Sequence, residues 1–83
     1  MRRAPSASAR AVFGANLRRA REARGLSQEA LGAAANMHRT AVGAIERGEA
    51  NVTIDNMERL ARAVEVDLSE LLARKGASGG PQG

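Results

Sequence analysis

The sequence of 83 residues contains no cysteine, tryptophan or tyrosine, and Phe13 is its single phenylalanine. Without cysteine, the chain has neither a disulfide framework nor a thiolate ligand for a metal. With one such aromatic ring, it has no stacking platform for the bases of single-stranded nucleic acid. It also lacks an apolar run long enough to cross a membrane. These absences favour a small domain whose core is built from aliphatic side chains.

Acidic residues are almost missing from the first part of the chain. Residues 1–25 hold seven arginines and one acidic residue, Glu22, which gives them a net charge of +6. Residues 26–83 hold six basic and eight acidic residues, a net charge of −2. A basic flank beside a nearly neutral body suits a polyanionic partner, although a solvated surface explains it equally well.

The first residues, Met1-Arg2-Arg3, resemble the start of an export signal. Ser6, Ser8 and Arg10 interrupt the apolar run that such a signal needs. We therefore expect a cytoplasmic, nucleoid-associated protein with no membrane partner.

Composition divides the chain into three parts. Residues 1–8 are small, basic and broken by Pro5, which predicts a flexible N-terminal arm. Residues 74–83 are rich in glycine, which predicts a disordered tail. Between them, residues 9–73 are rich in Ala and Leu and show helical spacing without strand alternation. We expect a single all-α domain over 9–73.

Capping residues divide this domain into five short helices. Gly25 and Gly48 suit helix C-termini because glycine accepts the left-handed conformation. Ser27 and Thr53 are N-cap residues, and Asp67 with an acid three residues later forms an approximate capping box. The helices are expected over residues 9–24, 28–35, 38 or 39 to 47, 54–64 and 68–72.

Helical spacing also predicts which side chains face inward. In chain order they are Phe13, Leu17, Ala20, Ala23, Ala30, Leu31, Ala34, Met37, Val42, Ile45, Ile54, Met57, Leu60, Ala61 and Val64. Gly32, inside the second helix, is expected to cost about 1 kcal/mol relative to alanine.

Residues 27–48 point most directly to a function. Two short helices are joined by a tight turn at Asn36, a residue type that tolerates positive φ. Small inward side chains on the first helix let the second cross it closely, which is the geometry of a helix-turn-helix that enters the major groove of DNA. Arg39 is placed to bond a guanine bidentately, worth about 1–3 kcal/mol of discrimination, and Thr40 to touch a thymine methyl or a phosphate. The outward residues of the second helix are His38, Arg39, Thr40, Gly43 and Ala44.

The order of these motifs resembles the Xre/Cro-type family of five-helix, lambda-repressor-like DNA-binding domains. The matching pieces are Arg21, Gly25-Leu26-Ser27-Gln28, Leu31, Asn36, Ile45-Glu46-Arg47-Gly48 and the run Val66 to Leu72. Within the family, His38-Arg39-Thr40 and Asn51-Val52-Thr53 are similar to controller proteins of restriction–modification systems. Ala41 and Ala44 stand where many relatives carry larger side chains, so DNA shape is expected to contribute to recognition.

The resemblance implies roles for individual residues. Arg39 and Thr40 would read bases, while Gln28 would bond a phosphate and support the recognition helix. With His38 and Ala44 of the outward face added, the expected DNA-binding set is Gln28, His38, Arg39, Thr40, Ala44, Arg47 and Asn51. His38, the single histidine, could also be a metal ligand or general base, but no cysteine or acid pair supports that. Arg21 and Glu46 would form a partly buried structural ion pair. The interface of a homodimer would contain Val66 with at least one of Leu68, Leu71 and Leu72, although these leucines could instead belong to the core of the protomer.

The sequence thus predicts a transcription regulator that binds a palindromic operator in double-stranded DNA as a homodimer, without a cofactor, metal or small-molecule ligand. One alternative is an antitoxin-like module whose main partner is a protein, with the arm or the tail as the docking segment. An enzyme has little support, because a single histidine without cysteine, tyrosine or a phosphate-cradling glycine loop offers no catalytic constellation.

Overall fold

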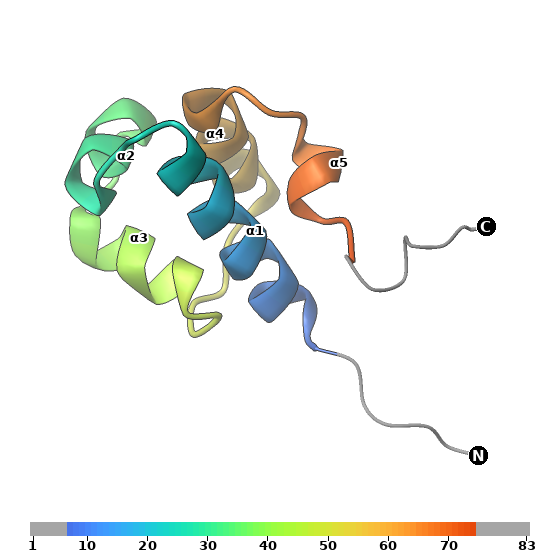
Figure 1. Cartoon of the computed structure of the whole chain (residues 1–83). Helices are drawn as coiled ribbons and strands as arrows, with labels where there is room; N and C mark the ends of the chain where they lie inside the picture. The colour runs from blue at the N-terminus through green and yellow to red at the C-terminus, as the bar shows by residue number, and fades with distance from the viewer. Residues whose placement is uncertain (1–6, 75–83) are drawn as a thin grey trace, which may run out of the picture.

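Five α-helices and no strand occur in residues 7–74, the part of the chain that the computed structural model describes (Figure 1). They are α1 (Ala9–Ala23), α2 (Gln28–Ala35), α3 (Arg39–Glu46), α4 (Ile54–Val64) and α5 (Leu68–Leu71). The predicted all-α, five-helix architecture is therefore confirmed. The expected arm and tail, residues 1–8 and 74–83, lie almost entirely outside the described residues.

Helix N-termini are set by short-range hydrogen bonds from side chains. Ser27 and Thr53 each accept a backbone N–H three residues along the chain, at 2.9 and 3.1 Å, and Ser8 does the same for α1 at 3.1 Å. Such caps satisfy backbone donors that the first turn leaves free. Asp67 occupies the N-cap position of α5 but makes no capping hydrogen bond through its side chain, so the predicted capping box is wrong.

Helix C-termini end in left-handed backbone. Gly25 and Gly48 have φ values of 70° and 75°, as their positions after the first and third helices predict. Asn36 closes α2 at φ 60°, and Glu65 closes α4 at φ 61°. Asn36 was expected from its residue type, whereas nothing in a glutamate indicates this conformation.

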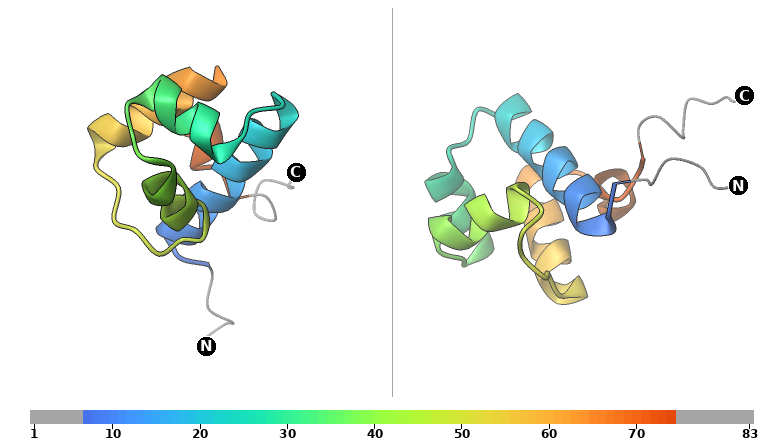
Figure 2. Two further views of the ribbon diagram at one scale, coloured as in Figure 1. Left: turned by 90° about the vertical axis from the view of Figure 1, so that its left-hand side faces the viewer. Right: turned by 90° about the horizontal axis from the view of Figure 1, so that it is seen from below.

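The core lies between α1 and the other helices. In Figures 1 and 2, α2 and α3 lie on one side of α1 and α5 lies on the other. Each fully buried aliphatic side chain contributes about 1.5–3 kcal/mol. The buried apolar residues are Phe13, Leu17, Leu31, Ala35, Val42, Ile45, Leu60, Ala61, Val64 and Leu71.

Three residues predicted to face inward lie on the surface. Ala23 and Ala34 are exposed, and Ile54 is 60% exposed. Ala23 and Ile54 are terminal residues of α1 and α4, where neighbouring helices no longer cover the side chain. In α2 the buried face is rotated by one position, so Ala35 and Gly32 face inward in place of Ala34.

Two glycines inside helices permit close contacts between backbones. A Cβ atom on Gly14 would lie 2.2 Å from the carbonyl oxygen of Ile45, and one on Gly32 would lie 2.4 Å from that of Met37. Gly14 therefore lets α1 cross the C-terminal end of α3. At Gly32 the expected penalty is outweighed, because glycine lets the turn fold back so that the N–H of Met37 donates to its carbonyl at 2.7 Å.

Candidate nucleic-acid interface

Helices α2 and α3 form the helix-turn-helix predicted for residues 27–48. Asn36 reverses the chain, and His38 occupies the N-cap position of α3. The ring Nδ1 of His38 accepts the N–H of Thr40 at 3.1 Å. Since Nδ1 is an acceptor, the proton of the neutral ring is on Nε2, which can donate to another group. His38 is exposed and begins the recognition helix.

Helix α3 has one buried and one exposed face. Val42, Ile45 and Glu46 are buried and fix the helix against the body of the domain. Thr40 and Ala41 are exposed and Ala44 is half-buried, so the outward face is made of short side chains. A helix with so little bulk can approach the floor of the major groove closely.

Arg39 is the long side chain at the start of this face. It is exposed, and within residues 7–74 its guanidinium has no hydrogen bond or ion pair with another residue. Its donors are therefore available for an external acceptor, and the fork of a guanidinium matches the two acceptors of guanine.

Gly43 does not belong to the outward face, contrary to the prediction from the sequence. The residue is buried, and a Cβ atom added to it would lie 3.2 Å from Nη1 of Arg47 and 3.5 Å from Oε1 of Gln28. These two side chains lie over Gly43. Its small size lets them pack over α3.

A buried ion pair supports α3 from behind. Arg21 Nε and Nη2 donate to Glu46 Oε2 and Oε1 at 2.7 and 3.1 Å, and Arg21 Nη1 donates to the carbonyl of Leu26 at 2.8 Å. The side chains of Glu46 and Arg21 are 2% and 11% exposed. Hydrogen bonding to the Glu46 carboxylate raises the pKa of Arg21 above its usual value, although burial acts in the opposite direction. The ion pair implied by the family resemblance is present.

Gln28 joins this network from the first turn of α2. Its Nε2 donates to Oε1 of Glu46 at 3.0 Å. A carboxylate only accepts hydrogen bonds, so the amide nitrogen and not the oxygen must face it. The second hydrogen on Nε2 is the one that could reach a phosphate. Gln28 therefore ties the start of α2 to the end of α3.

Arg47 and Asn51 flank the end of the recognition helix. Arg47 Nε donates to Glu49 Oε1 at 3.1 Å, and the two side chains are 59% and 61% exposed. Asn51 is exposed in the segment between α3 and α4 and lines a hollow with Arg10 of α1. The first turn of α1 thus lies beside this segment, and Arg10 adds positive charge there.

Two further arginines, one in α1 and one at its C-cap, are paired with acidic residues. Arg18 pairs with Glu22 at 3.0 Å and Arg24 pairs with Glu65 at 2.9 Å, all four side chains being well exposed. Exposed pairs of this kind contribute about 0–1 kcal/mol. The solvated-surface interpretation fits these two arginines.

The residues expected at a dimer interface differ in exposure. Leu71 is 2% exposed and belongs to the protomer core, so its assignment to the interface is corrected. Its side chain is covered because α5 packs this position against α1 and α4. Val66 and Leu68 are half-buried and Leu72 is 40% exposed. These three retain surface that a partner could cover.

Residues 7–74 contain no group of three or more His, Cys, Asp or Glu side chains arranged to hold a metal ion. In the same part of the chain, no helix has the length and apolar character needed to cross a membrane.

Comparison with known proteins identifies the family. The helix-turn-helix family HTH_3 matches residues 17–71, which contain α2, α3, α4 and α5 complete. The chain belongs to this Xre-type helix-turn-helix family. Its members are DNA-binding transcription regulators, so the family predicted from the motifs is confirmed.

Several relatives of this Xre-type domain are control proteins. Control protein C.SmaI of Serratia marcescens is 38% identical over 65 residues, which cover 78% of this chain and 77% of the relative. The restriction–modification controller protein C.AhdI from Aeromonas hydrophila is 42% identical, with a TM-score of 0.72 over 75% of this chain and 94% of that one. The hypothetical transcription factor NHTF from Neisseria is 32% identical, with a TM-score of 0.79 over 94% and 93% of the two chains.

Proposed function

We propose that this protein is a sequence-specific transcription regulator of the restriction–modification controller type, which binds a palindromic operator as a homodimer. The observation that supports it most is the outward face of α3, where Arg39, unpaired within residues 7–74, lies beside the small side chains of Thr40, Ala41 and Ala44. Control proteins among the relatives support the regulatory context.

Recognition is divided between bases and phosphates. Arg39 reads a guanine and Thr40 contacts a thymine methyl or a phosphate, while Ala44 leaves room for close approach. The phosphate contacts come from side chains around the helix: Gln28, His38, Arg47 and Asn51. With few long side chains on α3, the shape of the DNA contributes to specificity. Because cationic contacts to phosphates release counterions, binding weakens steeply as salt increases.

A homodimer accounts for an apolar surface along α4 and α5, made of Ile54, Met57, Val66, Leu68 and Leu72. Leu72 and Ile54 are the large hydrophobic residues exposed in the described part of the chain, at 40% and 60%. Leu72 and Met57 of α4 line the hollow that Arg10 and Asn51 also line, and Leu68 lines another hollow with Glu58 of α4. A two-fold contact through this surface presents two copies of α3 to successive major grooves, about 34 Å apart.

In vitro selection of bound duplexes from a random pool tests the proposal. A dimeric regulator selects a two-fold symmetric consensus with half-sites about one helical turn apart. Selection at several salt concentrations separates specific from diffuse binding. Failure of the folded protein to enrich any consensus would contradict the proposal and favour a protein-interaction module.

A further inference from the structure

Helix α5 is too short to hold its own conformation. It spans only Leu68–Leu71, and isolated helices of this length are unstable in water. Its N-cap residue, Asp67, supplies no side-chain hydrogen bond. The carbonyls of Leu68, Ser69 and Glu70 accept backbone N–H groups of Leu72 and Ala73, whereas that of Leu71 accepts none within residues 7–74. Contacts from elsewhere must therefore keep α5 and the residues after it in place.

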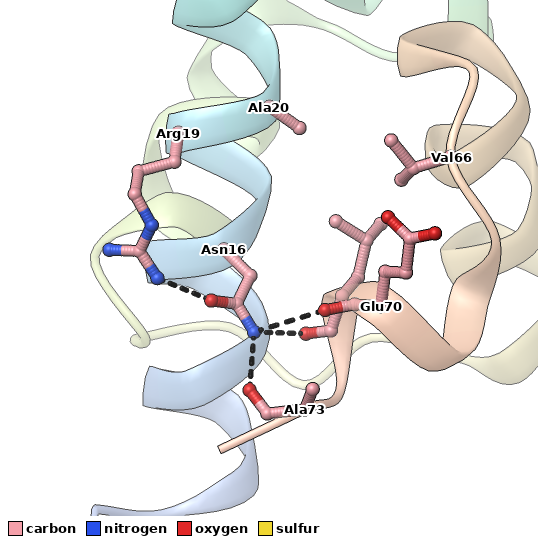
Figure 3. A pocket seen from close by; sticks show the side chains of 7 residues that line it. Asn16, Arg19, Ala20, Val66, Glu70 and Ala73 are labelled. Atoms are coloured by element: carbon pink, nitrogen blue, oxygen red, sulfur yellow. Dashed lines mark hydrogen bonds between the residues drawn. The ribbon is translucent and has the colours of Figure 1, made fainter. Parts of the chain in front are cut away.

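Leu71 supplies apolar contacts by packing in the core, and Asn16, in the middle of α1, supplies hydrogen bonds. Its Nδ2 donates to the carbonyl oxygens of Leu71 and Ala73, both at 2.9 Å, with a longer approach of 3.4 Å to that of Glu70. Its Oδ1 accepts a hydrogen bond from Nη2 of Arg19, which leaves the amide nitrogen facing α5 (Figure 3). These bonds join residues 54–57 positions apart.

The two shorter bonds bracket Leu72. The carbonyl before this residue and the carbonyl after it are both held by one amide group, so the backbone at Leu72 is fixed relative to α1. Two residues further along the chain, Arg74 Nη1 donates to the carbonyl of Ala7 at 2.6 Å, which adds a second contact. Leu71 is buried in the core, whereas Leu72 is 40% exposed. The segment is thus anchored on its inner side and presents Leu72 outward.

We propose that Asn16 is a positioning residue for dimerisation: by holding the carbonyls on both sides of Leu72, it fixes the apolar surface that the second copy contacts. This inference rests on the proposed homodimer. A surface whose backbone is already ordered loses less conformational entropy when the partner binds. Asn16 itself lies on α1 and makes its contacts within the protomer, so its effect on association passes through the position of Leu72.

The substitution Asn16→Asp tests the positioning role of Asn16, because it changes the shape of the side chain little. It replaces the donating amide by a carboxylate oxygen that faces two carbonyl oxygens. Asn56→Asp is the matched control, because Oδ1 of Asn56 also accepts from an arginine three residues later, Arg59. Among residues 7–74 the side chain of Asn56 reaches no other helix by a hydrogen bond. It also lies about 200° around α4 from Ile54 and so faces away from the apolar surface.

Sedimentation velocity without DNA measures the dissociation constant of each dimer, and urea denaturation measures the stability of each protomer. Asn16→Asp is expected to raise the dissociation constant by about tenfold or more, and Asn56→Asp to leave it within about twofold. If Asn16→Asp does not fold, Asn16→Ala removes the donors without adding charge and is expected to weaken the dimer in the same direction.

The outcomes separate this inference from the proposed function. A wild-type protein that remains monomeric at every concentration would contradict the homodimer itself. A dimeric wild type with equally tight Asn16 variants would overturn the role of Asn16 and leave the homodimer intact. A lower denaturation midpoint with an unchanged dissociation constant would also overturn it, since a role confined to protomer stability has that result.

Discussion

The guanidinium of Arg21 and the carboxylate of Glu46 meet in a two-pronged hydrogen-bonded pair that ties the last turn of α1 to the last residue of α3. The pair is enclosed, with Glu46 2% exposed, and Gln28 adds a third contact from α2. Three helices thus meet at one carboxylate directly behind the recognition helix. The orientation of α3 depends on this junction as well as on apolar packing.

Glu46→Gln is expected to lower the free energy of unfolding by about 3 kcal/mol, because it leaves a buried arginine without its charged partner. Glu65→Gln is the matched control, since Glu65 pairs with Arg24 on the surface and its loss should cost less than about 1 kcal/mol. Urea denaturation followed by circular dichroism measures both. Equal effects from the two substitutions would contradict the role of the buried pair.

The Arg21–Glu46 ion pair should add no pH dependence to the free energy of unfolding near neutrality. Hydrogen bonding to Glu46 raises the pKa of Arg21. A basic group whose pKa is raised by folding contributes stability that is fully present below its unfolded pKa and is lost only as pH rises through the folded value, here in strong alkali. The stability difference between wild type and Glu46→Gln should therefore stay constant between about pH 7 and about pH 10. A difference that shrinks across this range would contradict the assignment.

Gly14→Ala should destabilise the protein. In an exposed helix interior this exchange stabilises by up to about 1 kcal/mol, through helix propensity. Here the new Cβ atom would meet the carbonyl of Ile45 at 2.2 Å and push α1 away from α3, an overpacking that costs about 1–3 kcal/mol or more. Thermal denaturation shows directly whether Gly14→Ala lowers or raises the melting temperature. A raised melting temperature would show that the two helices do not cross this closely.

Glu49→Gln should strengthen binding to any DNA sequence. Glu49 places a carboxylate against Arg47 at the end of the recognition helix, where phosphates are expected. Removing that charge should tighten binding by about threefold at low salt, equally on operator and random duplexes. Glu22→Gln changes the net charge identically on α1 and should have a smaller effect. Weaker binding by Glu49→Gln would instead indicate that Glu49 orients the guanidinium of Arg47.

Local chemistry made the helix boundaries predictable from the sequence. Ser27 and Thr53 cap helices through atoms three residues away, and Asn36 and Gly48 adopt positive φ because of their own residue types. Such signals need no knowledge of the tertiary structure. The motifs between them were sufficient to identify the helix-turn-helix.

Packing between distant segments was not predictable in the same way. Which face of α2 is buried depends on how α3 and α4 cross it, so Ala34 was placed inward where Ala35 lies. Leu71 and Leu72 are adjacent leucines, and only the contacts of α5 with α1 show which one is buried. Asn16 was missed entirely, although an asparagine in a helix interior has low helix propensity and is a signal to look for a tertiary partner.

Equilibrium binding of wild type and Arg39→Ala to the selected operator and to a random duplex tests most directly whether α3 reads DNA sequence. Arg18→Ala is the control, because it removes the same charge from the exposed side of α1. We expect Arg39→Ala to lose the preference for the operator while its affinity for random DNA stays within about threefold of wild type. Arg18→Ala should keep the preference. Equal losses by Arg39→Ala on operator and random DNA would contradict base reading by Arg39.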